Sequence, residues 1–147
     1  MCAYRLDQRI LLFVSNLHTS GLRFNVPPAH PIDAQADAAE VGRTVRLLLA
    51  RSRVDGEMPT DVNARQKALL EGTGFRSWSQ LERRAAHCLI VQEESAISIE
   101  PSRNETRHER GPTRGHAYLP DRERFVSADC TDEVLGKALR HALDSCA

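Results

Sequence analysis

Residues 37–49 read DAAEVGRTVRLLL, and residues 131–143 read TDEVLGKALRHAL. When the segments are aligned on Gly42 and Gly136, both place a helix-capping residue five positions before the glycine, an aliphatic residue directly before it and a basic residue directly after it. Both also carry an aliphatic residue, an arginine and a leucine at three, four and seven positions after the glycine. Because the apolar positions share one helical face, the pattern predicts two amphipathic helices of the same design.

The repeated glycine is the most specific part of this pattern. A glycine in the interior of a helix costs about 1 kcal/mol relative to alanine. Its presence at the same position in both segments predicts that each helix closely approaches another part of the molecule there. The alternative is that two unrelated amphipathic helices share the pattern by chance. The pattern contains no catalytic group.

Length and composition limit the possible classes of protein. The chain has 147 residues, which fits one domain, 1–147, with a core large enough to need no disulfide or metal. Its four cysteines form no CxxC pair, so we expect free thiols in a reduced, cytoplasmic protein. The first residues resemble no signal peptide, and no stretch approaches the roughly 20 apolar residues of a membrane span. With 20 basic and 20 acidic residues, we do not expect a dedicated nucleic-acid-binding domain.

The remaining segments predict a mixed fold. Apolar and alternating runs indicate strands at 9–15 and 22–26, joined as a hairpin, and Pro27, Pro28 and Pro31 should then end the sheet pairing. The further elements expected are helices at 62–71, 77–87 and 132–144 and strands at 88–92, 96–100, 117–119 and 124–127. Hairpins and helices in separate runs favour an α+β fold, a single domain with a largely antiparallel sheet of about five or six strands packed by about four helices.

Two segments could indicate nucleic-acid binding. Residues 64–84 have the outline of a helix-turn-helix, with Gln80, Arg83 and Arg84 on the helix that would read DNA, although two short helices joined by glycines are more often a plain helical hairpin. Residues 102–115 contain four arginines and no aliphatic anchor, which predicts a long mobile loop that could also contact phosphates. A nucleic-acid-binding regulator is therefore a second hypothesis.

No catalytic residue, metal site or cofactor is expected from the sequence. The six histidines lack the i, i+4 spacing of a helical zinc motif, and we find no phosphate-binding loop, nucleophile elbow or dinucleotide fingerprint. His18 stands beside the hydroxyl groups of Thr19 and Ser20, so a small hydrolase or nuclease using His18 with a remote carboxylate is a third hypothesis. In a hairpin turn, such residues more often make turn hydrogen bonds.

The acidic residues fall into two groups. Carboxylates at the starts of the two patterned helices stabilise the helix dipole and need no partner. Glu93 and Glu94 at the expected tip of the second hairpin, together with Glu100, have no such local role. They could form an acidic patch that faces a basic partner, although a solvated hairpin tip explains them as well.

Several ordered features together resemble the family of bacterial contact-dependent growth inhibition immunity proteins. They are HTSG at 18–21 with the proline-rich link after it, the first patterned helix, GFRSWSQL at 74–81, ISIEP at 97–101, and the closing helix with Leu135 and Gly136. The resemblance extends over nearly the whole chain. It rests on spacing and on aliphatic and glycine positions, and it includes no catalytic signature.

The resemblance implies a small cytoplasmic protein that is not an enzyme. Such a protein binds and neutralises the C-terminal toxin domain of a large contact-delivered exoprotein, commonly a nuclease acting on tRNA or DNA. We expect a one-to-one complex, with no direct nucleic acid, membrane or small-molecule partner. Glu93, Glu94, Glu100 and Asp121 are the candidate toxin-binding residues, because acidic groups can mimic phosphate and speed encounter with a basic cleft. The neutral net charge means that any such attraction must be local.

Overall fold

The computed structural model describes residues 1–54, 57–105 and 116–146. The strands are β1 Cys2–Arg5, β2 Arg9–Leu17, β3 Arg23–Asp33, β4 Ala86–Gln92, β5 Ala96–Asn104, β6 His116–Tyr118 and β7 Arg124–Ser127. The helices are α1 Ala38–Leu49, α2 Val62–Leu70, α3 Trp78–Arg84 and α5 Asp132–Asp144, with a 3-10 turn, η1, at Pro120–Arg122. None of the helices in these ranges has the length and apolar character needed to cross a membrane.

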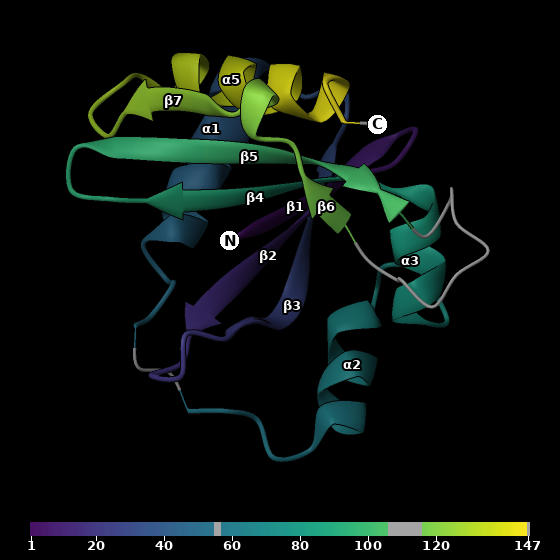
Figure 1. Ribbon diagram of the computed structural model, residues 1–147. Coiled ribbons are helices and arrows are strands. Elements are labelled where there is room, and N and C mark those ends of the chain that lie inside the picture. Colours follow the sequence, from purple (N-terminus) through teal and green to yellow (C-terminus); the bar gives the residue numbers. More distant parts are fainter. Residues whose placement is uncertain (55–56, 106–115, 147) are drawn as a thin grey trace.

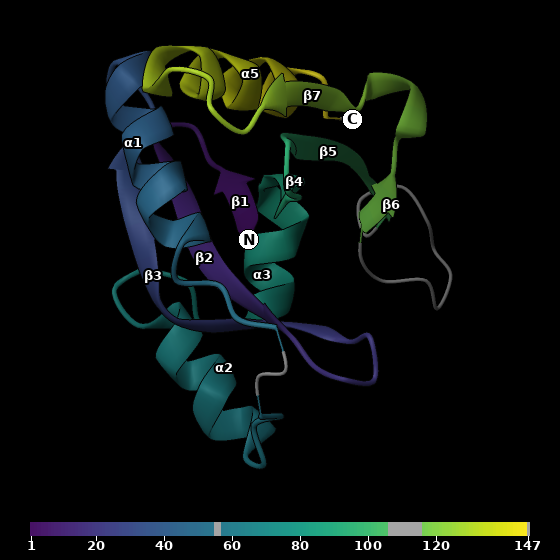
Figure 2. The same cartoon turned by 90° about the vertical axis from the view of Figure 1, so that its left-hand side faces the viewer.

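The strands form one seven-stranded sheet in the order β3-β2-β1-β4-β5-β6, with β7 also paired to β5. All of these strand pairs are antiparallel. Four α-helices in the described part of the chain pack on the sheet (Figures 1 and 2). The predicted α+β class with a largely antiparallel sheet is therefore confirmed.

The central strand β1 is absent from the strands predicted by sequence. Ala3 of β1 pairs with Leu12 of β2 on one side and with Cys88 of β4 on the other. Ala3 belongs to the apolar cluster on one face of the sheet, and Tyr4 belongs to the cluster on the opposite face. A strand of four residues is too short to show a clear period in the sequence. Its place in the sheet depends on pairing with β2, which follows it directly, and with the distant strand β4.

The prediction that Pro27, Pro28 and Pro31 end the sheet pairing is wrong. β3 pairs with β2 on both sides of the Pro27–Pro28 pair, with a register shift between Leu12 and Val14. β3 is the edge strand, so one side of its backbone has no neighbouring strand to which it must donate. A proline, which has no N–H group, is tolerated in this position.

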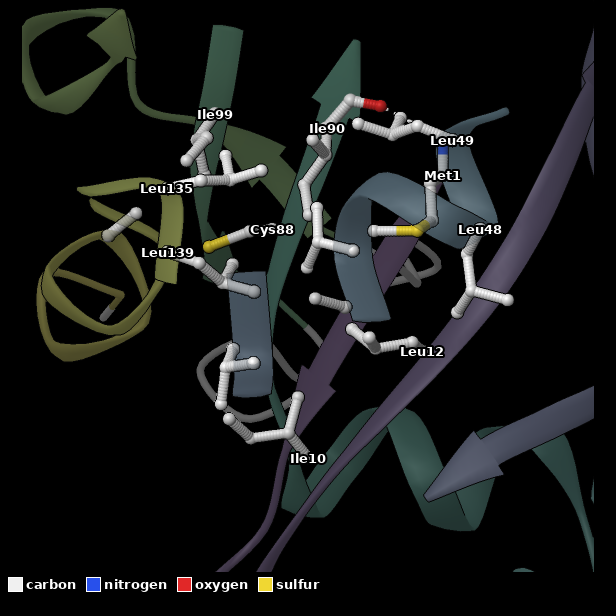
Figure 3. Packing of buried hydrophobic residues seen from close by; sticks show 14 of the residues in the cluster. Met1, Ile10, Leu12, Leu48, Leu49, Cys88, Ile90, Ile99, Leu135 and Leu139 are labelled. Atoms are coloured by element: carbon white, nitrogen blue, oxygen red, sulfur yellow. Dashed lines mark hydrogen bonds between the residues drawn. The ribbon is translucent and has the colours of Figure 1, made fainter. Parts of the chain in front are cut away.

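α1 and α5 cover one face of the sheet, which we call the closed face (Figure 2). Its cluster of buried side chains joins β1, β2, β4 and β5 to both helices. Figure 3 shows Ile99 of β5 beside Leu135 of α5, and Cys88 of β4 with its sulfur directed towards Leu139. These side chains are fully buried, so this cluster is the main core.

The two patterned helices cross each other at their glycines. A Cβ atom on Gly42 would lie 1.8 Å from the carbonyl oxygen of Asp132, and one on Gly136 would lie 1.8 Å from that of Ala38. Asp132 and Ala38 are the first residues of α5 and α1. The predicted close approach is confirmed, and the element that each helix approaches is the first turn of the other.

The arginines four positions after the glycines extend this reciprocal contact. Arg46 donates to the carbonyl oxygens of Cys130 at 2.6 Å and Ala128 at 2.7 Å. Arg140 donates to the carbonyl oxygen of Ala36. Cys130 and Ala36 each stand directly before the capping residue of the opposite helix, so the two guanidinium groups have equivalent roles.

α2 and α3 pack on the other face of the sheet. The rings of Tyr4, Phe13 and Trp78 meet edge to face, with centroid distances of 5.5 to 5.6 Å. Leu81 of α3 is fully buried beside them. α3 ends at Arg84 rather than near residue 87 as predicted, because β4 already begins two residues later.

β5 is longer than predicted. It runs to Asn104, and its last three residues pair with β6. The prediction of a loop is therefore wrong for residues 102–104, since their pairing depends on a strand more than ten residues further along the chain. Residues 106–115, the greater part of the predicted loop, lie outside the described residues.

Candidate interaction surface

Part of the face that carries α2 and α3 is left uncovered. These helices belong with β1, β2 and β3, and no α-helix in the described ranges stands over β4, β5 and β7 on this side (Figure 1). Strand alternation directs to this area side chains that include Leu89, Val91, Ser98, Glu100, Tyr118 and Phe125. We call these six residues the open sheet face.

Two aromatic side chains give the open sheet face its apolar character. Phe125 is 68% exposed and Tyr118 is 44% exposed. Phe125 stands opposite Ser98, which is too small to cover its ring. The next residue, Val126, points the other way and packs against the closed-face core. Exposed aromatic rings on an ordered strand are typical of a binding surface.

Acidic groups lie beside these rings. Burial raises the pKa of Glu100, and the negative charge of nearby Glu123 raises it further. The hydroxyl group of Tyr118 donates to Glu123, and this hydrogen bond raises the pKa of Tyr118 to about 12. Glu100 and Glu123 therefore repel each other, and Arg23 and the ammonium group of Met1 offset only part of the rise in the pKa of Glu100, so a cationic partner would stabilise the pair.

The structure separates the four acidic residues predicted as toxin-binding. Glu93 and Glu94 are exposed at the turn between β4 and β5, Glu100 lies in the middle of β5, and Asp121 lies exposed in η1. η1 contacts β5, so Asp121 borders the same strand. Glu100 alone belongs to the open sheet face.

Sequence reasoning missed Glu123, Tyr118 and Phe125. Alternation within 124–127 shows that Phe125 and Val126 face opposite sides. It does not show which side the helices cover, because that depends on where α1 and α5 dock.

A cavity of about 600 Å³ adjoins the hairpin tip. It lies where β1 begins while its neighbours β2 and β4 continue, and its lining includes Met1, Leu17, Arg23, Val54 and Glu93. The ammonium group of Met1 donates to the carbonyl oxygen of Ile90 at 2.9 Å, and burial lowers its pKa. Glu93 therefore lies at the edge of this cavity.

The segment at 64–84 contains the two helices of the predicted helix-turn-helix outline, but α3 is used for packing. The side of α3 that carries Trp78 and Leu81 lies against the sheet. Gln80 accepts a hydrogen bond from the backbone of Arg76 at 3.1 Å, as a helix-capping residue does. The guanidinium group of Arg84 lies 5.9 Å from the centroid of the Phe75 ring. Gln80 and Arg84, two of the proposed reading side chains, therefore have structural roles within the protein.

His18 lies in the turn between β2 and β3. Its Nδ1 atom is 2.8 Å from the hydroxyl oxygen of Ser20 and accepts from the Ser20 backbone at 3.1 Å. These are turn hydrogen bonds, the second of the two interpretations given above. Among the described residues, no three His, Cys, Asp or Glu side chains are grouped so that they could hold a metal ion.

Comparisons with known proteins give one family, from a family model, and one fold, from solved structures. A family model described as CdiI, CDI immunity protein, matches residues 25–146. A chain of the CdiA-CT/CdiI toxin and immunity complex from Yersinia pseudotuberculosis superposes with a TM-score of 0.73 at 18% identity, covering 99% of this chain and 95% of that one. A protein of unknown function from Neisseria meningitidis, NMB0488, superposes with a TM-score of 0.76 at 18% identity, covering 99% and 93% of the two chains. No curated protein matches the sequence significantly.

Proposed function

Because this chain belongs to the CDI immunity protein family, we propose that it binds the CdiA-CT toxin domain encoded with it and blocks that toxin in the cytoplasm of the producing cell. The family match carries this proposal. A likeness in fold to a chain from a toxin and immunity complex supports it. The inhibitor acts by occupying the toxin as a one-to-one complex, without catalysing a reaction of its own.

The toxin is proposed to be a nuclease. A nuclease cleft that holds phosphates is basic, and acidic side chains can take the place of those phosphates. Glu100 and Glu123 form such an acidic pair, and Glu93, Glu94 and Asp121 extend negative charge towards both ends of β5.

The open sheet face is the proposed centre of the interface. Tight protein interfaces derive most of their affinity from a few central aromatic or charged residues within a buried area of about 1,600 Å². Phe125 and Tyr118 supply aromatic rings, and Glu100 supplies the charge. Because the backbone of this surface belongs to a sheet, it needs no large rearrangement to bind.

The first experiment tests inhibition by direct binding. Cells expressing the toxin domain encoded immediately upstream should regain growth when this chain is co-expressed, and a one-to-one complex should co-purify. Restored growth without a complex would contradict the proposed mechanism.

The second experiment tests the proposed surface by calorimetry with a catalytically inactive toxin. Phe125→Ala should weaken binding by at least about tenfold, as expected for a central aromatic residue. Leu47→Ala is its matched control, since Leu47 is 63% exposed but lies on α1, and it should leave the affinity unchanged. Glu100→Gln should slow association at low salt, whereas Glu71→Gln, at the end of α2, should not. Equal effects of each variant and its control would place the interface elsewhere.

The two other hypotheses have direct tests. A nucleic-acid-binding regulator should bind random duplex DNA at about 50 mM salt and lose that binding steeply as salt rises. A hydrolase using His18 should show turnover that His18→Ala abolishes.

A further inference from the structure

Two cysteines far apart in the sequence lie side by side at the C-terminal end of α5. The Sγ atoms of Cys88 and Cys146 are 3.6 Å apart, although 58 positions separate them in the chain. Cys88 is on β4, faces the closed-face core and is fully buried, with its sulfur directed towards α5 (Figure 3). Cys146 follows the end of α5 and is partly exposed. The pair therefore connects the core to a position that solvent can reach.

Several contacts hold the two sulfur atoms in this position. The Cys146 Sγ lies 3.1 Å from the carbonyl oxygen of His87, the residue before Cys88. Arg5 on β1 donates to the carbonyl oxygen of Leu143 at 3.0 Å, and Arg122 on η1 donates to that of Ser145 at 2.6 Å. The end of α5 is thus fastened from two sides, which keeps Cys146 against β4.

The two thiols differ in reactivity. A thiolate, rather than a thiol, attacks a disulfide. The hydrogen bond from Cys88 lowers the pKa of Cys146, whereas that hydrogen bond together with burial raises the pKa of Cys88. Cys146 is also the more accessible of the two. Cys146 is therefore suited to react first and Cys88 to react second.

We propose that Cys88 and Cys146 are a reversible redox site, which a small disulfide such as oxidised glutathione converts to an intramolecular disulfide. The Cys146 thiolate attacks one sulfur of oxidised glutathione, forms a mixed disulfide and releases one glutathione thiolate. The Cys88 sulfur then attacks the Cys146 sulfur and breaks the bond to the second glutathione. That glutathione leaves with the proton of Cys88, so two protein thiols are oxidised and one molecule of oxidised glutathione is reduced to two thiols.

The geometry fits bond formation. A disulfide needs its sulfur atoms about 2.05 Å apart, so the pair must close by roughly 1.5 Å. Cys146 can make this movement because it lies beyond the last helical residue. The bond would fasten the end of α5 to a central strand, and a closed loop of this length should raise the unfolding temperature by on the order of 10 °C.

The remaining cysteines provide controls within the same chain. The Cys2 Sγ accepts a hydrogen bond from Ser15 at 3.6 Å, and the Cys130 Sγ lies 3.8 Å from Arg46. Neither has a second cysteine sulfur as its hydrogen-bond partner among the described contacts. Cys130→Ser should therefore leave the redox site intact, whereas Cys146→Ser should remove it.

The test treats the folded protein with oxidised glutathione, then alkylates it under denaturing conditions and measures the intact mass. Two alkyl adducts and a peptide linking Cys88 to Cys146 are expected, with four adducts after reduction. The treated protein should also melt at a higher temperature than the reduced protein, and Cys146→Ser should show no such difference. Four adducts after treatment, a lasting glutathione adduct on Cys146, or a bridge that involves Cys2 or Cys130 would each overturn the proposal.

Discussion

The two faces of the sheet are covered in opposite ways. On the closed face, α1 and α5 meet through backbone atoms, with Gly42 and Gly136 each against the first turn of the other helix. On the other face, α2 and α3 cover one part, and the rings of Phe125 and Tyr118 are left exposed on the rest. The first face has no space for an added methyl group, and the second has space for a partner. The main stabilising contacts and the proposed binding surface thus lie on different sides of one sheet.

The largest expected effect on stability comes from adding a side chain at Gly136, where α5 crosses α1. Gly136→Ala should lower the free energy of unfolding by at least about 3 kcal/mol or prevent folding, because the new methyl group would overlap the backbone of α1. At an ordinary helix position, the same change would stabilise by about 1 kcal/mol. Lys137→Ala, on the exposed side of α5, should change stability by less than about 0.5 kcal/mol in the same urea titration. A stable Gly136→Ala protein would show that the helices can separate at little cost.

A smaller loss of stability is expected from replacing Arg46, the arginine four positions after Gly42. Arg46→Met should cost about 2 kcal/mol, since it removes hydrogen bonds to the carbonyl groups of Ala128 and Cys130 and the contact with Asp132 at 3.1 Å. Arg43 also lies near Asp132, but at 3.8 Å and with a mostly exposed side chain. Arg43→Met should therefore be nearly neutral in the same urea titration. Equal losses for the two variants would contradict the specific role of Arg46.

The stability of the protein should depend on pH through His87, which lies on the part of the second face that α2 and α3 cover. Burial, and then the charge of His116, lowers the pKa of His87 to about 3. At pH values between about 3 and the usual histidine pKa of about 6.5, the unfolded chain therefore binds a proton at His87 and the folded chain does not. Stability from this residue is complete above about pH 6.5 and is lost as the pH falls, by up to about 1.4 kcal/mol per pH unit.

Urea titrations between pH 7 and 5 measure this slope. His87→Gln should reduce it, and His141→Gln, at an exposed position on α5, should leave it unchanged. The raised pKa values of Glu82 and Glu100 act in the opposite direction at lower pH, so the variants rather than the wild type isolate His87. An identical slope in His87→Gln and the wild type would show that this imidazole does not control acid stability.

The smallest effect on stability is expected on the open sheet face. Phe125→Ala should change the free energy of unfolding by less than about 0.5 kcal/mol, because its ring is already largely in water. The same variant should lose toxin affinity, as proposed above. A large loss of stability, measured in the absence of toxin, would mean that the ring has a structural role and would weaken the assignment.

The sequence predicted the closed face better than the open one, for a physical reason. The glycine pattern is local within each helix, and its period of 3.6 residues marks the buried side directly. β1 pairs with β4 and the last part of β5 pairs with β6, which are both further along the chain, and four or fewer residues of alternation cannot reveal such partners. The prolines of β3 were misjudged because the edge position of that strand is a property of the whole sheet.

The candidate site was predicted in part. Glu100 lies on the open sheet face, whereas Glu93, Glu94 and Asp121 lie around it. Phe125 and Tyr118 were not identified, because an apolar residue in a strand is ordinarily assigned to the core. Their exposure follows from the docking of α1 and α5, which no local pattern near residue 125 encodes.

The glycine crossing also has a consequence for synthesis on the ribosome. The first turn of α1 and the first turn of α5 are separated by about ninety positions, and each is the surface on which the other helix rests. Until residues 132–144 leave the exit tunnel, the side of α1 that meets α5 and the strands beneath α5 have no helix over them. A nascent chain therefore cannot complete this face until the segment made about ninety positions after α1 has emerged, and protection of this face from aggregation and proteolysis begins with that segment.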